Sequence, residues 1–438
     1  MSQNKSNFIP NAVEEQAIVA WLQQNALPIQ YDTAGNGFAD LQPLKEILRD
    51  VKVIALGEAT HGSHEIYTLK HRLVEFLVSE MGFTNFTLEG STAGCTAIND
   101  YVLFGSGDLS DVLSNQGYMC WDTEEFTAMV RWMRAYNESA QEEKKIHFWG
   151  NDIWRNDLGR TAVVEYLRRV APEKLADVRV LFEAVAVEEV KWPFPIDEDT
   201  VKVYGQLCKS LQTVIDDFRA NRDAYLRCSS STEYMQVLHF LEVMQQLFLV
   251  PKPFEDYQRS KFIGENLIHR IEQSPPGEKF IFWAHNGHIK LGDYAPQENS
   301  AGYFLRMKYG KEYYALSFHL HLGAFLARGS GEDGYPGAYH HVALPAVPDG
   351  SFPWVLSHTR LNKFMINLRC PVVDPVVERW IESENAEIWG GQWDNEGGIE
   401  NMKFSENYDG IVFIERTTPS HPTANAIAHS KIRSGGFF

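Results

Sequence analysis

Short apolar runs rich in β-forming residues recur along this chain, separated by longer segments of helical periodicity. The six runs span residues 51–56, 83–88, 145–149, 279–284, 313–318 and 411–414. Nearly continuous apolar runs are typical of strands that are buried on both faces, as in a parallel sheet covered by helices. Between the first two runs, residues 64–81 have a helical pattern, which predicts a β-α-β unit with a right-handed crossover. The sequence therefore predicts an α/β fold with a mostly parallel β-sheet flanked by helices.

A long segment without strand signals interrupts this pattern. Between about residues 155 and 270, apolar residues repeat at helical spacing, for example Leu158, Ala162 and Tyr166. We interpret 155–270 as a large helical insertion or cap on an α/β catalytic body formed by residues 1–154 and 271–438. After His319, the chain up to about Ser351 is rich in Gly, Pro and His, which predicts loops at the rim of a pocket.

The overall composition bounds what the chain can bind. The 58 acidic residues outnumber the 40 basic ones, and the formal net charge of −18 disfavours nucleic acid and anionic membrane surfaces as partners. No apolar run approaches the roughly 20 residues of a membrane span. The polar amino terminus has no secretory signal, and the five scattered cysteines lack a CxxC pair. These features predict a cytoplasmic protein that acts on a small molecule.

Ionisable residues follow the strand-like runs. They are Glu58 and His61 after the first run, Glu89 after the second, Asp152 after the third, and His285 with His288 after the fourth. A single Glu in such a place is usually a charge at a helix N-terminus, and a single His is more often structural. However, the carboxyl ends of parallel strands lie along one edge of a sheet, where ligands bind. We therefore expect these side chains to converge on one cleft.

Several common catalytic motifs are absent or incomplete. The spacing of Gly57 and Gly62 is that of a phosphate-binding loop, but Ser63 stands where the loop requires Lys. The sequence contains neither the GxSxG of a serine α/β-hydrolase nor the HExxH of a zinc protease. The first absence argues against a serine α/β-hydrolase, and the second excludes a zinc protease of the HExxH type.

Three segments resemble the erythromycin esterase family: ALGEATHG at 55–62, Leu-Glu at 88–89 and AHNGHI at 284–289. Weaker likeness at 121–134, 148–153, 344–351 and 408–414 extends the resemblance from about residue 40 to about residue 418. It implies hydrolysis of a macrolide lactone by a water that a His activates, without a cofactor. By motif, His61 is the general base, with Glu58 beside it and Glu89 facing it, and His285 and His288 complete the site.

The resemblance also implies residues that contact the substrate. The candidates are Lys70, Asp152, His64 and Trp121. Two positions depart from the family pattern, because Lys70 stands where Arg is typical and Arg259 is followed by Ser260 where Asp is typical. A Lys ammonium lacks the planar fork of Arg, so a bidentate contact would be lost.

Two alternatives remain at this point. Glu58, His61, Glu89 and His285 could instead hold a divalent metal such as zinc or manganese, which would activate the water. The chain could also be a haem-binding or small-molecule-binding protein, with ligands from His319-Leu320-His321 or His340-His341. Binding alone does not require a Glu beside a base, so the pattern favours a hydrolase.

Overall fold

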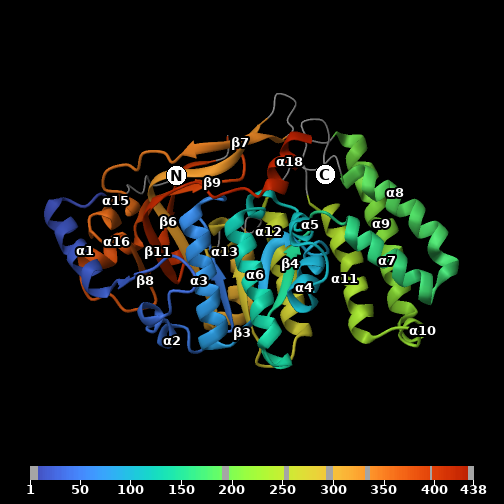
Figure 1. Cartoon of the computed structure of the whole chain (residues 1–438). Helices are drawn as coiled ribbons and strands as arrows, with labels where there is room; N and C mark the ends of the chain where they lie inside the picture. The colour runs from blue at the N-terminus through green and yellow to red at the C-terminus, as the bar shows by residue number, and fades with distance from the viewer. Residues whose placement is uncertain are drawn as a thin grey trace.

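The structure, a computed structural model, describes residues 8–189, 197–250, 256–292, 299–330, 336–394 and 397–432. Within these ranges, a nine-stranded sheet has the strand order β1-β8-β11-β6-β2-β5-β3-β4, with β7 paired to β6 (Figure 1). A separate two-stranded sheet pairs β9 with β10. The strands are β1 (Leu27–Pro28), β2 (Val53–Leu56), β3 (Phe83–Ser91), β4 (His147–Asp152), β5 (Lys279–Trp283), β6 (Tyr313–Ser330), β7 (Pro336–Ala343), β8 (Lys363–Asn367), β9 (Glu384–Gly390), β10 (Gly397–Lys403) and β11 (Gly410–Thr417).

The centre of the large sheet is parallel. β11, β6, β2, β5, β3 and β4 pair with their neighbours in parallel, whereas β8 and β1 add an antiparallel edge. Each of these six parallel strands overlaps one of the six apolar runs of the sequence. The predicted fold class is therefore confirmed.

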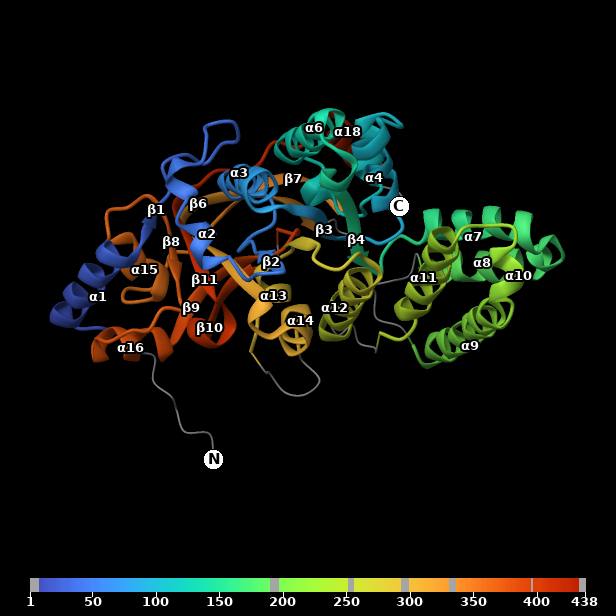
Figure 2. The same ribbon diagram turned by 90° about the horizontal axis from the view of Figure 1, so that it is seen from below.

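Alternating side chains along the strands build a core on each face of the sheet. On β2, Ile54 and Leu56 belong to one core, whereas Val53 and Ala55 belong to the other. In Figure 2, helices lie on both sides of the sheet. The first face is covered by α3 (His64–Met81), α4 (Cys95–Phe104), α5 (Leu109–Ser114) and α6 (Glu124–Ser139). The second is covered by α1 (Ala12–Asn25), α12 (Asp256–Gln273), α14 (Ala301–Tyr309), α15 (Phe352–Ser357) and α16 (Pro375–Glu382).

A group of helices lies beside the sheet, next to α12 and β4, in both views (Figures 1 and 2). It consists of α7 (Asp157–Val170), α8 (Leu175–Glu189), α9 (Glu198–Ala220), α10 (Arg222–Leu226) and α11 (Ser231–Leu247). These helices share a core of their own that includes Leu167, Leu211 and Leu241. The predicted insertion extends to residue 270, but α12 packs Ile263 and Leu267 into the core of the sheet.

The remaining helices are short or peripheral. They are α2 (Leu44–Ile47), α13 (Asn286–Ile289), α17 (Phe404–Asn407) and α18 (Ala424–Ile432). No helix in the described ranges has the length and apolar character needed to cross a bilayer.

Part of the segment between His319 and Ser351 departs from the expectation of loops. Residues 344–351 form neither helix nor strand, as expected, and residues 331–335 lie outside the described ranges. β6 continues to Ser330 and pairs with β7 in antiparallel register, with Ala324 opposite Ala343. The partner strand satisfies the backbone hydrogen bonds, so the local Gly content does not end the strand.

Candidate functional site

The loop that follows β2, residues 57–63, contains two glycines whose backbone lies very close to neighbouring atoms. A Cβ atom on Gly57 would lie 2.1 Å from Oδ1 of Asn286. Gly62 has a φ of +89°, and a Cβ there would lie 2.1 Å from the carbonyl oxygen of Leu326. Only glycine fits such positions without displacing its neighbours. The two glycines that imitate the spacing of a phosphate-binding loop therefore shape the loop that carries the Glu and the His.

The carboxylate of Glu58 is fully buried and accepts hydrogen bonds at both oxygens. Oε1 lies 2.7 Å from Nδ1 of His61 and accepts the indole N–H of Trp121 at 3.2 Å. Oε2 accepts from Nε1 of Trp283 at 2.9 Å and from Nζ of Lys70 at 3.1 Å. Burial alone would raise the pKa of Glu58, but the charge of Lys70 and the bond to His61 outweigh it, so this pKa is lowered. Glu58 is therefore ionised at neutral pH.

Lys70 lies behind Glu58 rather than at a surface. Its side chain is fully buried, and its Nζ lies 3.7 Å from the ring centre of Trp283. Burial lowers the pKa of Lys70 to about 8, against the opposing effect of Glu58. In this arrangement, the ammonium group contacts Glu58 and an indole ring, and it supports the carboxylate from within the core.

The imidazole rings of His61 and His285 lie side by side, with their centres 5.1 Å apart. His285 follows β5 and caps α13, so its Nδ1 accepts the backbone N–H of Gly287 at 3.1 Å. Its Nε2 lies 3.3 Å from the carbonyl oxygen of Ala59. Burial lowers the pKa of His285 to about 3, so the ring is neutral. Because Nδ1 accepts a hydrogen bond, the single ring proton is on Nε2.

Glu89, in β3, contacts the backbone of His285 through one oxygen and the side chains of Arg259 and His288 through the other. Its Oε2 accepts the backbone N–H of His285 at 2.8 Å. Its Oε1 accepts from Nη2 of Arg259 at 2.7 Å and lies 3.0 Å from Nε2 of His288. Burial would raise the pKa of Glu89, but the charges of His288 and Arg259 hold it well below its usual range.

Arg259, on α12, lies between two carboxylates from adjacent strands. Besides Glu89, it binds Asp152 at the end of β4, with Nη2 at 2.6 Å and Nε at 3.1 Å from Oδ2. The hydroxyl of Tyr118 also accepts a hydrogen bond from Nη2 at 2.7 Å. Ser260, next in the chain, has its Oγ 2.8 Å from Nδ1 of His288. A single guanidinium therefore holds the carboxyl ends of β3 and β4 against α12.

The structure brings most of the sequence-predicted site residues into one connected centre. One half contains Glu58, His61, Trp121 and Lys70, and the other contains Glu89, His288 and Asp152. His285 joins them through its ring and its backbone N–H. Trp121 is fully buried, and its ring meets that of His61 edge-on at 5.4 Å. His64 instead contacts Glu125, with Nδ1 2.6 Å from Oε1.

Sequence reasoning missed three residues of this centre: Arg259, Trp283 and Tyr118. Arg259 could have been found, since it lies four residues before Ile263 and so continues the apolar stripe of α12. A charged residue on a buried stripe requires a buried partner. Trp283 has no such signal, because it ends an apolar run in which an aromatic residue is ordinary.

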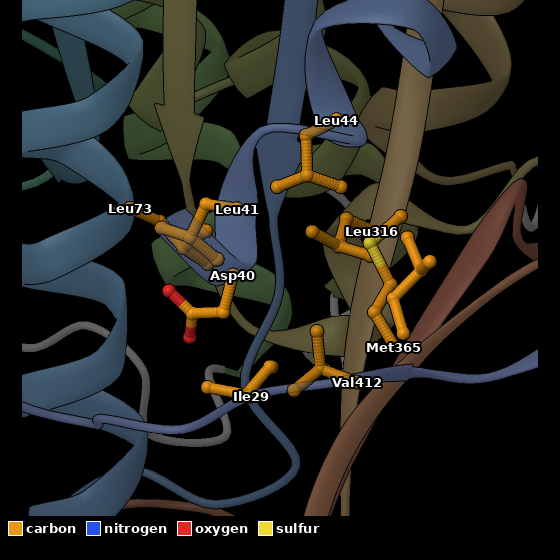
Figure 3. A pocket seen from close by; sticks show the side chains of 9 residues that line it. Ile29, Asp40, Leu41, Leu44, Leu73, Leu316, Met365 and Val412 are labelled. Atoms are coloured by element: carbon orange, nitrogen blue, oxygen red, sulfur yellow. The ribbon is translucent and has the colours of Figure 1, made fainter. Parts of the chain in front are cut away.

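An apolar pocket lies elsewhere in the fold, between α3 and the β8–β11–β6 part of the sheet (Figure 3). Its lining consists of Leu27, Ile29, Asp40, Leu41, Leu44, Leu73, Leu316, Met365 and Val412. The only charged side chain of this lining, Asp40, is bound by Arg72. None of the predicted site residues lines the pocket, and no ionisable group in it is available for chemistry.

The two glutamates of the centre do not suit the metal alternative in this arrangement. Each oxygen of Glu58 accepts an indole N–H, from Trp121 or from Trp283, and these groups do not deprotonate. The oxygens of Glu89 accept a backbone N–H and a guanidinium N–H. A divalent cation held by Glu58, His61, Glu89 and His285 would have to displace these donors. His319, offered for haem, is buried against Phe404 and Tyr408.

The fold and this centre define a hydrolase built on a parallel α/β sheet. The family model described as erythromycin esterase matches residues 78–417. The chain therefore belongs to the erythromycin esterase family. The loop at residues 57–63 precedes the matched residues, which include Glu89, Asp152, Arg259, His285 and His288.

Individual relatives are distant but extend over most of the chain. The putative hydrolase YbfO of Bacillus subtilis (strain 168) is 23% identical over 444 residues, which cover 93% of each chain. Erythromycin esterase type II of Escherichia coli is 24% identical over 293 residues, which cover 62% of this chain and 68% of that one.

Two solved structures show the same fold. A succinoglycan biosynthesis protein superposes with a TM-score of 0.79 at 24% identity, covering 94% of this chain and all of that one. An erythromycin esterase mutant in its open conformation superposes with a TM-score of 0.67 at 13% identity, covering 87% of this chain and 94% of that one.

Proposed function

We propose that this protein hydrolyses a carboxylic ester, the lactone of a macrolide such as erythromycin, with a water activated by His61. The observation that carries the proposal is the 2.7 Å contact between Nδ1 of His61 and the buried, ionised Glu58, next to the ring of His285. Membership of the erythromycin esterase family supports the reaction. The relative named erythromycin esterase type II supports a macrolide as the substrate.

His61 is suited to the role of general base. Because Glu58 is ionised, it accepts the Nδ1–H of His61 and leaves Nε2 with a free lone pair. A neutral imidazole can take a proton from water, and the carboxylate stabilises the imidazolium that forms. The side chain of His61 is 12% exposed, so water can reach it.

The hydroxide attacks the ester carbonyl, and negative charge develops on the carbonyl oxygen. Gly287 occupies Nδ1 of His285 and fixes the ring proton on Nε2, which lies 3.3 Å from the carbonyl oxygen of Ala59. In the proposed step, this N–H turns from that carbonyl to the ester oxygen beside the base. Its low pKa keeps this ring neutral, so it acts as a hydrogen-bond donor that does not compete for the proton of water. When the C–O bond of the ester breaks, the imidazolium of His61 gives its proton to the leaving alcohol.

Glu89 and Arg259 act by positioning. Glu89 holds the backbone of His285, and Arg259 holds Glu89. Neither group needs to exchange a proton during the reaction.

The experiment is to incubate the full chain with a panel of macrolides and to measure by mass spectrometry the gain of one water. Opening of the lactone by the wild-type chain, and not by a His61→Ala variant, is the expected result. A simple aryl ester serves as the second substrate. Hydrolysis of the aryl ester with every macrolide intact would overturn the macrolide assignment, and failure with both would overturn the esterase assignment.

A further inference from the structure

We infer that His64, Glu125 and His421 form a binding site for a divalent transition-metal cation such as zinc. These residues come from three separate parts of the chain. His64 begins α3, Glu125 lies in the first turn of α6, and His421 lies in the segment that follows β11. The proposed catalytic mechanism uses none of them.

The two imidazoles converge on one carboxylate oxygen. Nδ1 of His64 lies 2.6 Å and Nδ1 of His421 lies 2.7 Å from Oε1 of Glu125. The candidate ligand atoms of all three residues lie within 4.8 Å of one another. Two imidazole nitrogens and one carboxylate oxygen are a ligand set of zinc, with water in the open position.

A cation can replace the protons at this place. The atoms that contact Glu125 are imidazole nitrogens, which bind a metal ion in their neutral form. At Glu58, by contrast, the donors include indole groups that keep their proton. Glu125 therefore suits a metal ion and Glu58 does not, because the groups that donate hydrogen bonds to the two carboxylates differ.

The ligands combine a fixed carboxylate with a movable imidazole. Only 3% of the Glu125 side chain is exposed, and both of its oxygens lie 3.2 Å from the backbone nitrogen of His421. The side chain of His421 is 67% exposed, so its ring can shift to reach the metal–ligand distances of about 2.0–2.2 Å. The two rings are nearly perpendicular, at 88°, with centres 5.3 Å apart.

The electrostatic surroundings favour a cation. Besides the carboxylate of Glu125, the negative charges of Glu65 and Asp32 act on His64. A group of negative charge that stabilises an imidazolium also stabilises a bound cation.

The backbone already holds the three ligands in place. The N–H of His64 donates to the carbonyl of Thr418 at 2.9 Å, and the N–H of Glu124 donates to the carbonyl of His421 at 2.8 Å. The N–H of Ser420 donates to the carbonyl of Gly62 at 2.8 Å. A bound cation would therefore join the loop that carries His61 to the segment after β11.

A second cluster, formed by His239, Glu242 and His269, lacks this convergence. Its candidate ligand atoms also lie within 4.8 Å of one another, but the two rings are stacked, with an interplanar angle of 7° and centres 4.2 Å apart, so their lone pairs lie in two separate parallel planes. Glu242 is also bound by Arg219 at 2.7 Å. We therefore assign the cation site to the His64 cluster alone.

The test is a calorimetric titration of the full chain with zinc chloride. The His421→Ala variant is compared with the wild type, and His358→Ala is the matched control. His358 also lies 2.6 Å from a glutamate, through Nδ1 to Oε1 of Glu15, but that pair contains no second imidazole. We expect His421→Ala to lose one zinc ion per chain, or to bind it at least about tenfold more weakly. The His358→Ala control should titrate like the wild type.

Cobalt provides an independent readout of the same site. The wild type should develop visible absorption with Co²⁺, and His421→Ala should lose that absorption while keeping its circular dichroism spectrum. If His421→Ala does not fold, His421→Gln takes its place, since the amide is also polar and exposed. Identical zinc and cobalt binding by the wild type and the variant would overturn the inference. An equal loss in His358→Ala would overturn it too, because it would indicate unspecific binding to surface histidines.

Discussion

The side chain of His61 is held by Glu58 through a 2.7 Å contact between Nδ1 and Oε1. Glu58 is fully buried, whereas His61 keeps a small exposed surface. A buried carboxylate behind an accessible imidazole fixes both the orientation and the tautomer of that imidazole.

Replacing His61 by Ala should remove the general base. We expect kcat for ester hydrolysis to fall at least ~10²-fold, because water is then a poor nucleophile at neutral pH. The measurement is steady-state kinetics on an ester that the wild type hydrolyses, with circular dichroism to show that the fold is retained. The control is His358→Ala, in which a surface His–Glu pair is lost. Undiminished kcat in His61→Ala would contradict the assignment.

Replacing Lys70 by Met should raise the pKa of Glu58. Lys70 is the main group that offsets the burial of this carboxylate. Without it, Glu58 remains protonated to a higher pH, and His61 then lacks an anionic partner. The acid limb of the pH dependence of kcat/KM should therefore move to higher pH. Removing one partner of a buried ion pair should also lower the free energy of unfolding by about 3–5 kcal/mol.

The control for this prediction is Lys70→Arg, which keeps the charge. Its acid limb should stay near that of the wild type, because the guanidinium still stabilises the ionised carboxylate. If Lys70→Met and Lys70→Arg had the same pH profile, a role of Lys70 in setting the charge of Glu58 would be ruled out.

The sequence predicts the parallel sheet because buried strands and surface helices differ in periodicity. The six runs are nearly continuous in apolar and β-forming residues, which is typical of strands covered on both faces. The same reasoning places Glu58, Glu89 and His285 at one edge, since their positions follow from the ends of these strands. The strands and the residues at their ends can therefore be predicted from the local sequence pattern.

Contacts between distant segments leave no such pattern. Trp283, at the end of β5, donates a hydrogen bond to Glu58, which follows the neighbouring strand β2. No feature of the segment around Trp283 indicates this partner. The pairing of β7 with β6 likewise depends on a hairpin register rather than on composition. The position of Lys70 behind Glu58 follows from how α3 packs on the sheet, which a single helical stripe does not determine.

Replacing Arg259 by Met should destabilise the fold by leaving two buried carboxylates without their shared cation. We expect the free energy of unfolding, measured by urea titration, to fall by about 3–5 kcal/mol. The loss should be smaller when Asp152→Asn is added, because one of the two uncompensated charges is then absent. The double-mutant cycle measures this coupling. Strictly additive effects would show that Arg259 and Asp152 do not stabilise each other.

Stability should fall in mild acid because several histidines are buried in the neutral form. Burial lowers the pKa of His71 and, with further nearby charges, of His269 to about 4, and that of His285 and His319 to about 3. In the unfolded chain each of these groups has its ordinary pKa of 6.5. Between pH 6.5 and 4 the unfolded chain therefore binds more protons, so stability is complete above pH 6.5 and is lost as the pH falls.

His71→Leu isolates one of these groups. The side chain is 8% exposed on α3, and its pKa is lowered by burial alone. Each such histidine contributes a slope of about 1.4 kcal/mol per pH unit between its two pKa values. The urea-derived free energy of unfolding should therefore fall less steeply from pH 6.5 to pH 4 in His71→Leu than in the wild type. If the free energy of unfolding fell equally steeply in both proteins, His71 would take up its proton in the folded protein. The space between α3 and the sheet would then be more polar than its apolar lining suggests.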